Sequence, residues 1–128
     1  MQNHRSLHVY QASLKLSRDI YAVADLSTPS ERFRLCAQMR RAAISVGSNI
    51  AEGCGRATSR DFSSFLDNAL GSARELGFQL AHARDCGLVS SDVTLPAIAR
   101  TIAVQKMLTS LIVRVRAGAR CRKGTDTQ

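Results

Sequence analysis

The stretch QMRRAAISVGSNIAEGCGR, from Gln38 to Arg56, constrains the fold most, because its residues separate onto three sides of a helix at 100° per residue. The first side is apolar and comprises Leu35, Met39, Ala42, Ala43, Val46, Ile50 and Gly53. The second is a continuous polar row of Gln38, Arg41, Ser45, Ser48, Asn49, Glu52 and Arg56. The third carries Phe33, Ala37, Ile44, Gly47 and Ala51. A helix with one core contact shows a single apolar stripe, so we expect this helix to pack against its own domain and against a second partner.

Apolar residues recur at intervals of three and four in four segments, and no segment alternates as a strand does. This pattern predicts an all-α chain with helices at about 6–26, 29–55, 59–86 and 91–118. Residues 119–128 are polar and basic, and we expect them to form a flexible tail. Because the helices are similar in length and the connections are short, we expect residues 1–118 to fold as one antiparallel, up-down-up-down four-helix bundle.

Local signals mark the expected helix ends. The sequence at 28–31, Thr-Pro-Ser-Glu, fits a capping box with proline at the first helical position. Gly53 and Gly55 mark the end of the second helix, and Thr58, Ser59 and Asp61 offer N-cap side chains for the third. Gly87 followed by Leu88 resembles a Schellman stop after the third helix.

The net charge is +8, and arginines, which bind phosphate and carboxylate alike, make up most of the 18 basic residues. No acidic residue lies between Val93 and Thr125, a stretch that contains Arg100, Lys106, Arg114, Arg116, Arg120, Arg122 and Lys123. These seven residues are our candidate phosphate ligands, and RNA or DNA is the candidate partner. The alternative is that a GC-rich genome raises the arginine content and that the charge only maintains solubility.

Aromatic residues are scarce, since Tyr and Phe together number six and mostly occupy helical core stripes. The sequence therefore gives no indication of base stacking. If nucleic acid binds, we expect contacts mainly to the backbone, with a steep salt dependence and little base preference.

The sequence offers little for catalysis, so we expect a protein that is not an enzyme and has no catalytic residue, cofactor or metal. His4 and His8 lie one turn apart but lack a third ligand, and His82 is isolated. The four cysteines form no CxxC pair, which is typical of thiols in a reducing cytoplasm. No apolar run approaches the roughly 20 residues of a membrane span, and MQNHRSLHVY lacks the apolar core of a signal peptide, so we expect a cytoplasmic protein without a membrane partner.

The polar row is interpreted as a register device between the second and third helices. A tight turn at 57–59 makes facing residue numbers sum to about 116, which predicts an ion pair between Arg41 and Glu75. The same register places Ser45 near Gly71 or Ser72, Asn49 near Asp67 or Asn68, and Glu52 near Ser64. Gln38 and Arg56 extend the row, with Asn49 and Glu52 hydrogen-bonded in its middle. The alternative role is direct binding of a ligand.

The third side of the second helix, with Phe33, Ala37, Ile44, Gly47 and Ala51, permits close approach of another helix. Together with the wide apolar side of the last helix, it favours an oligomer formed through the long faces of the bundle. The alternative is a tightly packed monomer core.

The sequence resembles the four-helix bundle proteins encoded in intervening sequences of bacterial 23S rRNA genes, over roughly residues 7–115. The SNIAEG and GR elements and the ALGS..EL element occur in order at the family's spacing. Where the family form SIPSNIAEG has proline, this chain has Gly47, which leaves the helix unbroken. The matching segments are Val9-Tyr10-Gln11, Glu31-Arg32-Phe33, residues 38–45 and 48–53, Gly55-Arg56, Phe62, Phe65-Leu66, Ala69, Gly71-Ser72 and Glu75-Leu76.

The resemblance implies a cytosolic all-α bundle that assembles as a ring, with a homopentamer favoured, and it brings no catalytic residues. More distantly, and mainly in architecture, the chain is similar to the accessory variability determinant of diversity-generating retroelements, a basic pentameric barrel that binds nucleic acid and a reverse transcriptase. Many family members are encoded outside rRNA genes, so the resemblance does not establish a role in rRNA processing. The leading hypothesis is a non-enzymatic oligomer that binds nucleic acid through arginines. The alternative is an oligomeric adaptor that binds another protein and whose charge is incidental.

Overall fold

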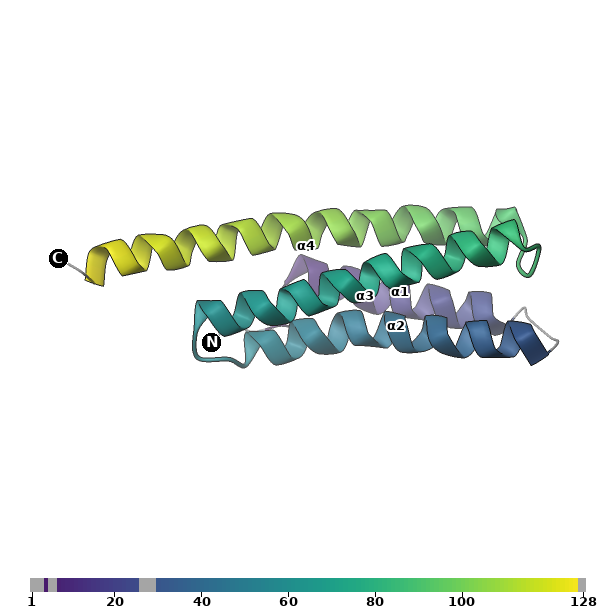
Figure 1. Cartoon of the computed structure of the whole chain (residues 1–128), viewed down its shortest axis with the longest axis horizontal. Helices are drawn as coiled ribbons and strands as arrows, with labels where there is room; N and C mark the ends of the chain where they lie inside the picture. Colours follow the sequence, from purple (N-terminus) through teal and green to yellow (C-terminus); the bar gives the residue numbers. More distant parts are fainter. Residues whose placement is uncertain (1–3, 5–6, 26–29, 127–128) are drawn as a thin grey trace.

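The computed structural model describes residue 4 and residues 7–25 and 30–126, with side chains described for 4, 7–23 and 34–118. These residues form four helices, α1 (His8–Asp25), α2 (Ser30–Cys54), α3 (Ser59–Asp85) and α4 (Ser91–Asp126), and the described part of the chain contains no strand. The helices lie side by side along one long direction, with the α2–α3 and α3–α4 connections at opposite ends (Figure 1). The prediction of an all-α chain with four helices is confirmed.

Each helix contacts its neighbours around a closed cycle, since α2 packs on α1 and α3 while α4 packs on α3 and α1. Their shared core includes side chains that are almost entirely buried, and α2 contributes the apolar side identified in its sequence. Burial of one such large apolar side chain stabilises the fold by about 1.5–3 kcal/mol. The largest fully buried side chains include Leu16, Ile20, Met39, Val46, Ile50, Leu66, Leu76, Leu80, Val104 and Leu108.

The connections follow the local signals in the sequence where the structure describes them. Thr58 caps α3, because its Oγ1 accepts a hydrogen bond from the Asp61 amide at 3.1 Å. At the other end of α3, Gly87 has φ +69°, and the Leu88 amide donates to the Ala83 carbonyl at 2.9 Å. This is the predicted Schellman stop, and it turns the chain from α3 into α4. The capping box expected at 28–31 lies outside the residues whose side chains are described.

The last helix is longer than the sequence predicted. The expected bounds of the first three helices lie within two residues of those in the structure, but α4 continues to Asp126 instead of ending at 118. Residues 119–126 therefore extend the helix where we expected a flexible tail. The physical reason is that this stretch contains one alanine, two arginines and one lysine, which favour a helix, lacks proline, and has a single glycine, which costs only about 1 kcal/mol in a helix. Figure 1 shows the end of α4 projecting beyond the other three helices.

Gly53 allows α2 to pack closely on α3. A Cβ atom at this position would lie 2.9 Å from the Phe62 ring and 2.9 Å from the Phe65 Cβ. Gly53 is the second-last residue of α2, so it lies at the helix end as predicted and also contributes to the packing of the α2–α3 hairpin.

Candidate nucleic-acid interface on α4

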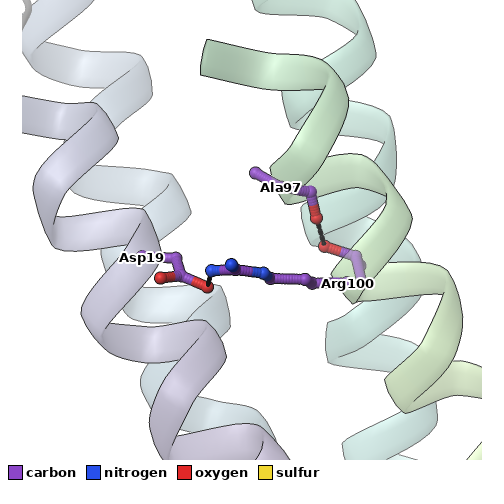
Figure 2. A network of polar contacts seen from close by, with 4 residues as sticks. Asp19, Ala97 and Arg100 are labelled. Carbon is purple, nitrogen blue, oxygen red and sulfur yellow. Dashed lines mark hydrogen bonds and ion pairs between the residues drawn. The ribbon is translucent and has the colours of Figure 1, made fainter.

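Two of the seven candidate phosphate ligands form ion pairs with other helices of the same chain. Arg100 forms an ion pair with Asp19 of α1, and Arg116 forms one with Asp67 of α3. Figure 2 shows the Arg100 side chain reaching from α4, just after Ala97, to the carboxylate of Asp19. Because each guanidinium is matched by a carboxylate, these two arginines join helices and contribute little free positive charge.

Lys106 and Arg114 are the described candidates that remain open to a ligand. Both are exposed, and neither forms an ion pair with a residue whose side chain the structure describes. They lie eight residues apart, about 12 Å along the helix, with Ser110 between them on the same face. The other three candidates, Arg120, Arg122 and Lys123, lie outside the described side chains.

A groove lies on each side of this Lys106–Ser110–Arg114 ridge, and the three residues line both. The groove towards α3 is completed by Leu70, Arg74, Ile102, Gln105, Thr109 and Val113. The groove towards α1 is completed by Leu7, His8, Val9, Met107 and Leu111. Gln105 joins α4 to α3, since its Nε2 donates to the Ala73 carbonyl at 3.2 Å. The α3 side of the ridge is therefore held by a hydrogen bond between the two helices.

Arg74 makes the α3-side groove a three-cation site. It is exposed and, like Lys106 and Arg114, has no ion-pair partner among the described side chains. Sequence reasoning missed Arg74, because it searched only the acid-free stretch of α4. The signal that would have found it is its place on the outer side of α3, one helix away in the bundle. Three cations around one groove are suited to binding successive phosphates of a polyanion.

The predicted ion pair between Arg41 and Glu75 is absent from the structure. The two residues line a common surface notch with Gln38, Ser45 and Ser72, but Glu75 Oε1 instead accepts a hydrogen bond from Gln79 Nε2 at 3.2 Å. Gln79 lies one turn further along the same helix. Arg41 and Glu75 are both exposed, where an ion pair between two helices gains little over solvation of the separate charges.

The polar row does contain one contact between α2 and α3. Ser45 Oγ lies 2.8 Å from Ser72 Oγ, in agreement with the predicted register. Asn49, however, donates to the Ser45 carbonyl at 2.8 Å and to Ser45 Oγ at 3.0 Å, so its amide stays within α2 rather than reaching Asp67 or Asn68. The Asn49 amide is therefore satisfied by an acceptor one turn away on its own helix.

The end of the row is an exposed cluster. Glu52 pairs with Arg56 at 3.7 Å, one turn away on the surface, and does not bond Asn49 as predicted. The Arg56 guanidinium lies over the Phe65 ring of α3, 4.6 Å from its centroid. Arg56 therefore contacts α3 through a cation–π interaction instead of a polar one.

The third side of α2 does not form a single open face. Gly47 lies against α1 of the same chain, where a Cβ would come 3.1 Å from Ser13 Oγ. Ala37 and Ala51 are half-buried, while Ile44 is 48% exposed. The interface prediction is thus wrong for Gly47, because α1 occupies the position expected for a second subunit. Phe33 lies outside the described side chains.

The described residues give no independent sign of a metal site, and the buried Cys54 is a poor nucleophile. No group of three or more His, Cys, Asp or Glu side chains among them is placed to hold a metal ion. Burial raises the pKa of the Cys54 thiol, which disfavours the nucleophilic thiolate. No helix within the described residues is long and apolar enough to cross a membrane.

The model of the 23S rRNA-intervening sequence protein family matches residues 5–110 of the chain. The chain belongs to this family. The chain is similar in fold to a solved structure of a protein of unknown function from the S23 ribosomal protein family of Bacteroides thetaiotaomicron, with a TM-score of 0.76. It is 24% identical, and the similarity covers 81% of this chain and 97% of that one. No curated protein sequence matches the chain.

The match to the 23S rRNA-intervening sequence protein family includes Arg100 and Lys106 but ends before Arg114. The B. thetaiotaomicron structure shows the same fold.

Proposed function

We propose that this member of the 23S rRNA-intervening sequence protein family is a non-enzymatic nucleic-acid-binding protein of the cytoplasm. Its antiparallel, up-down-up-down bundle acts as the subunit of a ring-like homo-oligomer, with a homopentamer favoured. The ring binds the phosphate backbone of RNA or DNA with little base preference. The observation that carries this proposal is the α3-side groove, in which Arg74, Lys106 and Arg114 stand exposed and without ion-pair partners among the described side chains.

The electrostatic mechanism follows from the arrangement of these cations. Each phosphate that a lysine or arginine neutralises releases condensed counterions, which makes binding favourable at low salt and weak at high salt. One subunit supplies only a few such contacts. Repetition of the groove around an oligomer raises the effective concentration of the remaining sites once one has bound, so weak contacts add up to useful affinity.

The function is tested by titrating structured RNA and duplex DNA against the wild-type chain at several salt concentrations. The variant K106Q/R114Q removes two cations from the ridge, and R18Q/R34Q removes the same charge from exposed positions on α1 and α2. We expect K106Q/R114Q to weaken binding much more than R18Q/R34Q. Absence of wild-type binding at low salt would contradict the proposal.

Oligomerisation is tested separately by light scattering. The proposal predicts a mass near five times the 13.9 kDa of one chain. A single species of 13.9 kDa at micromolar concentration would exclude the ring.

The second candidate function is an oligomeric adaptor for another protein, whose basic charge is incidental. The observation that favours it is the exposure of Ile44, at 48%, on the outer surface of α2. An oligomer that retains its fold but binds neither RNA nor DNA at low salt would support the adaptor over the nucleic-acid-binding protein.

A further inference from the structure

We propose that Phe78 and His82 on α3 form a stacking platform for an unpaired base, which makes the preferred ligand a single strand rather than a duplex. This inference rests on the proposed nucleic-acid binding and names the class of nucleic acid. It also departs from the expectation drawn from the sequence, in which the aromatic residues gave no indication of stacking.

Phe78 is the most exposed large apolar side chain that the structure describes, at 70%. Its ring is stacked on that of His82, one turn further along α3, with centroids 5.9 Å apart and planes inclined by 8°. The neighbouring ring restricts the orientation of Phe78, so a flat ligand meets a surface that is already ordered. An aromatic ring in this position offers its face to a nucleobase of any sequence, since every base has a π-face.

The charges beside the platform identify its ligand. Arg74 lies one turn before Phe78, about 6 Å along the helix, on the outer side of α3. It lines the groove that also contains Lys106 and Arg114. The platform therefore adjoins a three-cation groove, and a strand with one base on Phe78 can lay its neighbouring phosphates along these side chains.

Glu75, the nearest acidic residue before Phe78, does not lie between Phe78 and the three-cation groove. The carboxylate of Glu75 accepts a hydrogen bond from Gln79 and lies in the notch shared with α2, whereas the groove lies on the α4 side of α3. A duplex presents phosphates and base edges but keeps its base faces stacked inside. It therefore gains from the cations of the groove and not from Phe78.

The test uses the full-length chain and oligonucleotides of equal length: single-stranded RNA, single-stranded DNA, an abasic single strand and a duplex. F78L removes the aromatic face and keeps an apolar side chain, whereas F78Y retains the aromatic face. L14A alters an exposed apolar residue on α1 and serves as a control. We expect F78L to weaken binding of the base-containing single strands by about 5- to 150-fold, as for loss of one stacked base. F78Y and L14A are expected to bind like the wild type.

The salt dependence separates stacking from charge. We expect F78L to leave the slope of log K against log salt unchanged, and to bind the duplex and the abasic strand as the wild type does. Comparison of the RNA and DNA strands shows which backbone the site accepts. Circular dichroism and light scattering on each variant establish that fold and mass are retained.

Three results would overturn the inference, and they differ from one another. If K106Q/R114Q weakens binding and F78L does not, nucleic-acid binding stands and the stacking platform is wrong. If F78L lowers the oligomer mass, Phe78 is a contact between copies of the chain. If the wild type binds no nucleic acid at low salt, the proposed function fails and this inference fails with it.

Discussion

Arg100 on α4 forms an ion pair with Asp19 on α1, so a residue of the acid-free basic stretch is committed to joining two helices of its own bundle. The Asp19 side chain is 25% exposed, and the Arg100 side chain is 48% exposed. A partly exposed pair of this kind contributes about 0.5–1 kcal/mol to the free energy of unfolding. R100Q is therefore expected to lower stability by that amount in urea denaturation, with a smaller loss of nucleic-acid affinity than K106Q.

The double mutant D19N/R100Q supplies the control for this prediction. If the pair is the source of the effect, the two single mutants together cost more stability than the double mutant. Additive losses, or an affinity loss in R100Q as large as that in K106Q, would mean that Arg100 acts as a free cation.

Replacement by alanine is expected to have opposite effects on stability at two glycines of the α2–α3 hairpin, Gly53 and Gly71. G53A places a Cβ 2.9 Å from Phe62 and from Phe65, and we expect the overpacking to lower stability by about 1–2 kcal/mol after the helix propensity of alanine is included. G71A meets no atom within 4 Å inside the chain and is expected to raise stability by about 0.5–1 kcal/mol. Thermal and urea unfolding of both variants check the pair, and equal effects would contradict the α2–α3 packing.

Substitutions at Gly47 on α2 and Ser13 on α1 are expected to be coupled in their effects on stability. The Ser13 hydroxyl donates to the Tyr10 carbonyl at 2.6 Å, and its Oγ lies 3.1 Å from the place of a Cβ on Gly47. In an S13A background the nearest atom becomes the residue 13 Cβ at 3.9 Å, so G47A is expected to stabilise the bundle there by about 0.5–1 kcal/mol. In the wild-type background the gain is smaller or reversed. A double-mutant cycle without coupling would show that Gly47 faces away from α1.

The thiols of Cys54 and Cys86 are expected to differ in their reactivity towards a thiol reagent. Burial raises the pKa of Cys54, while Cys86 is exposed, so a thiol reagent is expected to label Cys86 before Cys54 in the folded chain. Labelling of Cys54 requires opening of the bundle. Its raised folded-state pKa also means that stability falls once the pH rises above the unfolded thiol pKa towards the folded one. Mass spectrometry of partly labelled protein checks the order, and equal rates would contradict the burial of Cys54.

The helices were predictable because their signals are local. Periodicity placed the first three helices within two residues, and Thr58 and Gly87 act as the caps that their positions suggest. The end of α4 was not predictable in the same way. A stretch of good helix formers with a single glycine is compatible with either a continued helix or a tail, and no strong stop decides between them.

The choice of polar partners was harder to predict than the register. Ser45 and Ser72 face each other across α2 and α3, as the predicted register requires. The Asn49 amide nevertheless bonds to an acceptor on its own helix. Short side chains have few rotamers and follow the backbone, whereas long exposed ones such as Arg41 have many alternatives of similar energy. Helix periodicity also does not tell which neighbour covers a side, and so Gly47 was assigned to a second subunit when α1 lies there.

The candidate site was predicted in part. Lys106 and Arg114 were named from the sequence, but the ion pairs of Arg100 and Arg116 depend on Asp19 and Asp67, carboxylates 81 and 49 residues away in the chain. Such contacts follow only from the packed bundle.

The salt dependence of nucleic-acid affinity tests the central claim most directly. Each phosphate contact contributes about 0.7–0.9 to the slope of log K against log salt. The account predicts that K106Q/R114Q lowers the magnitude of this slope by about 1.4–1.8, while R18Q/R34Q leaves it nearly unchanged. A slope that is the same in all three proteins, or a wild-type affinity that does not depend on salt, would contradict binding through the α4 ridge.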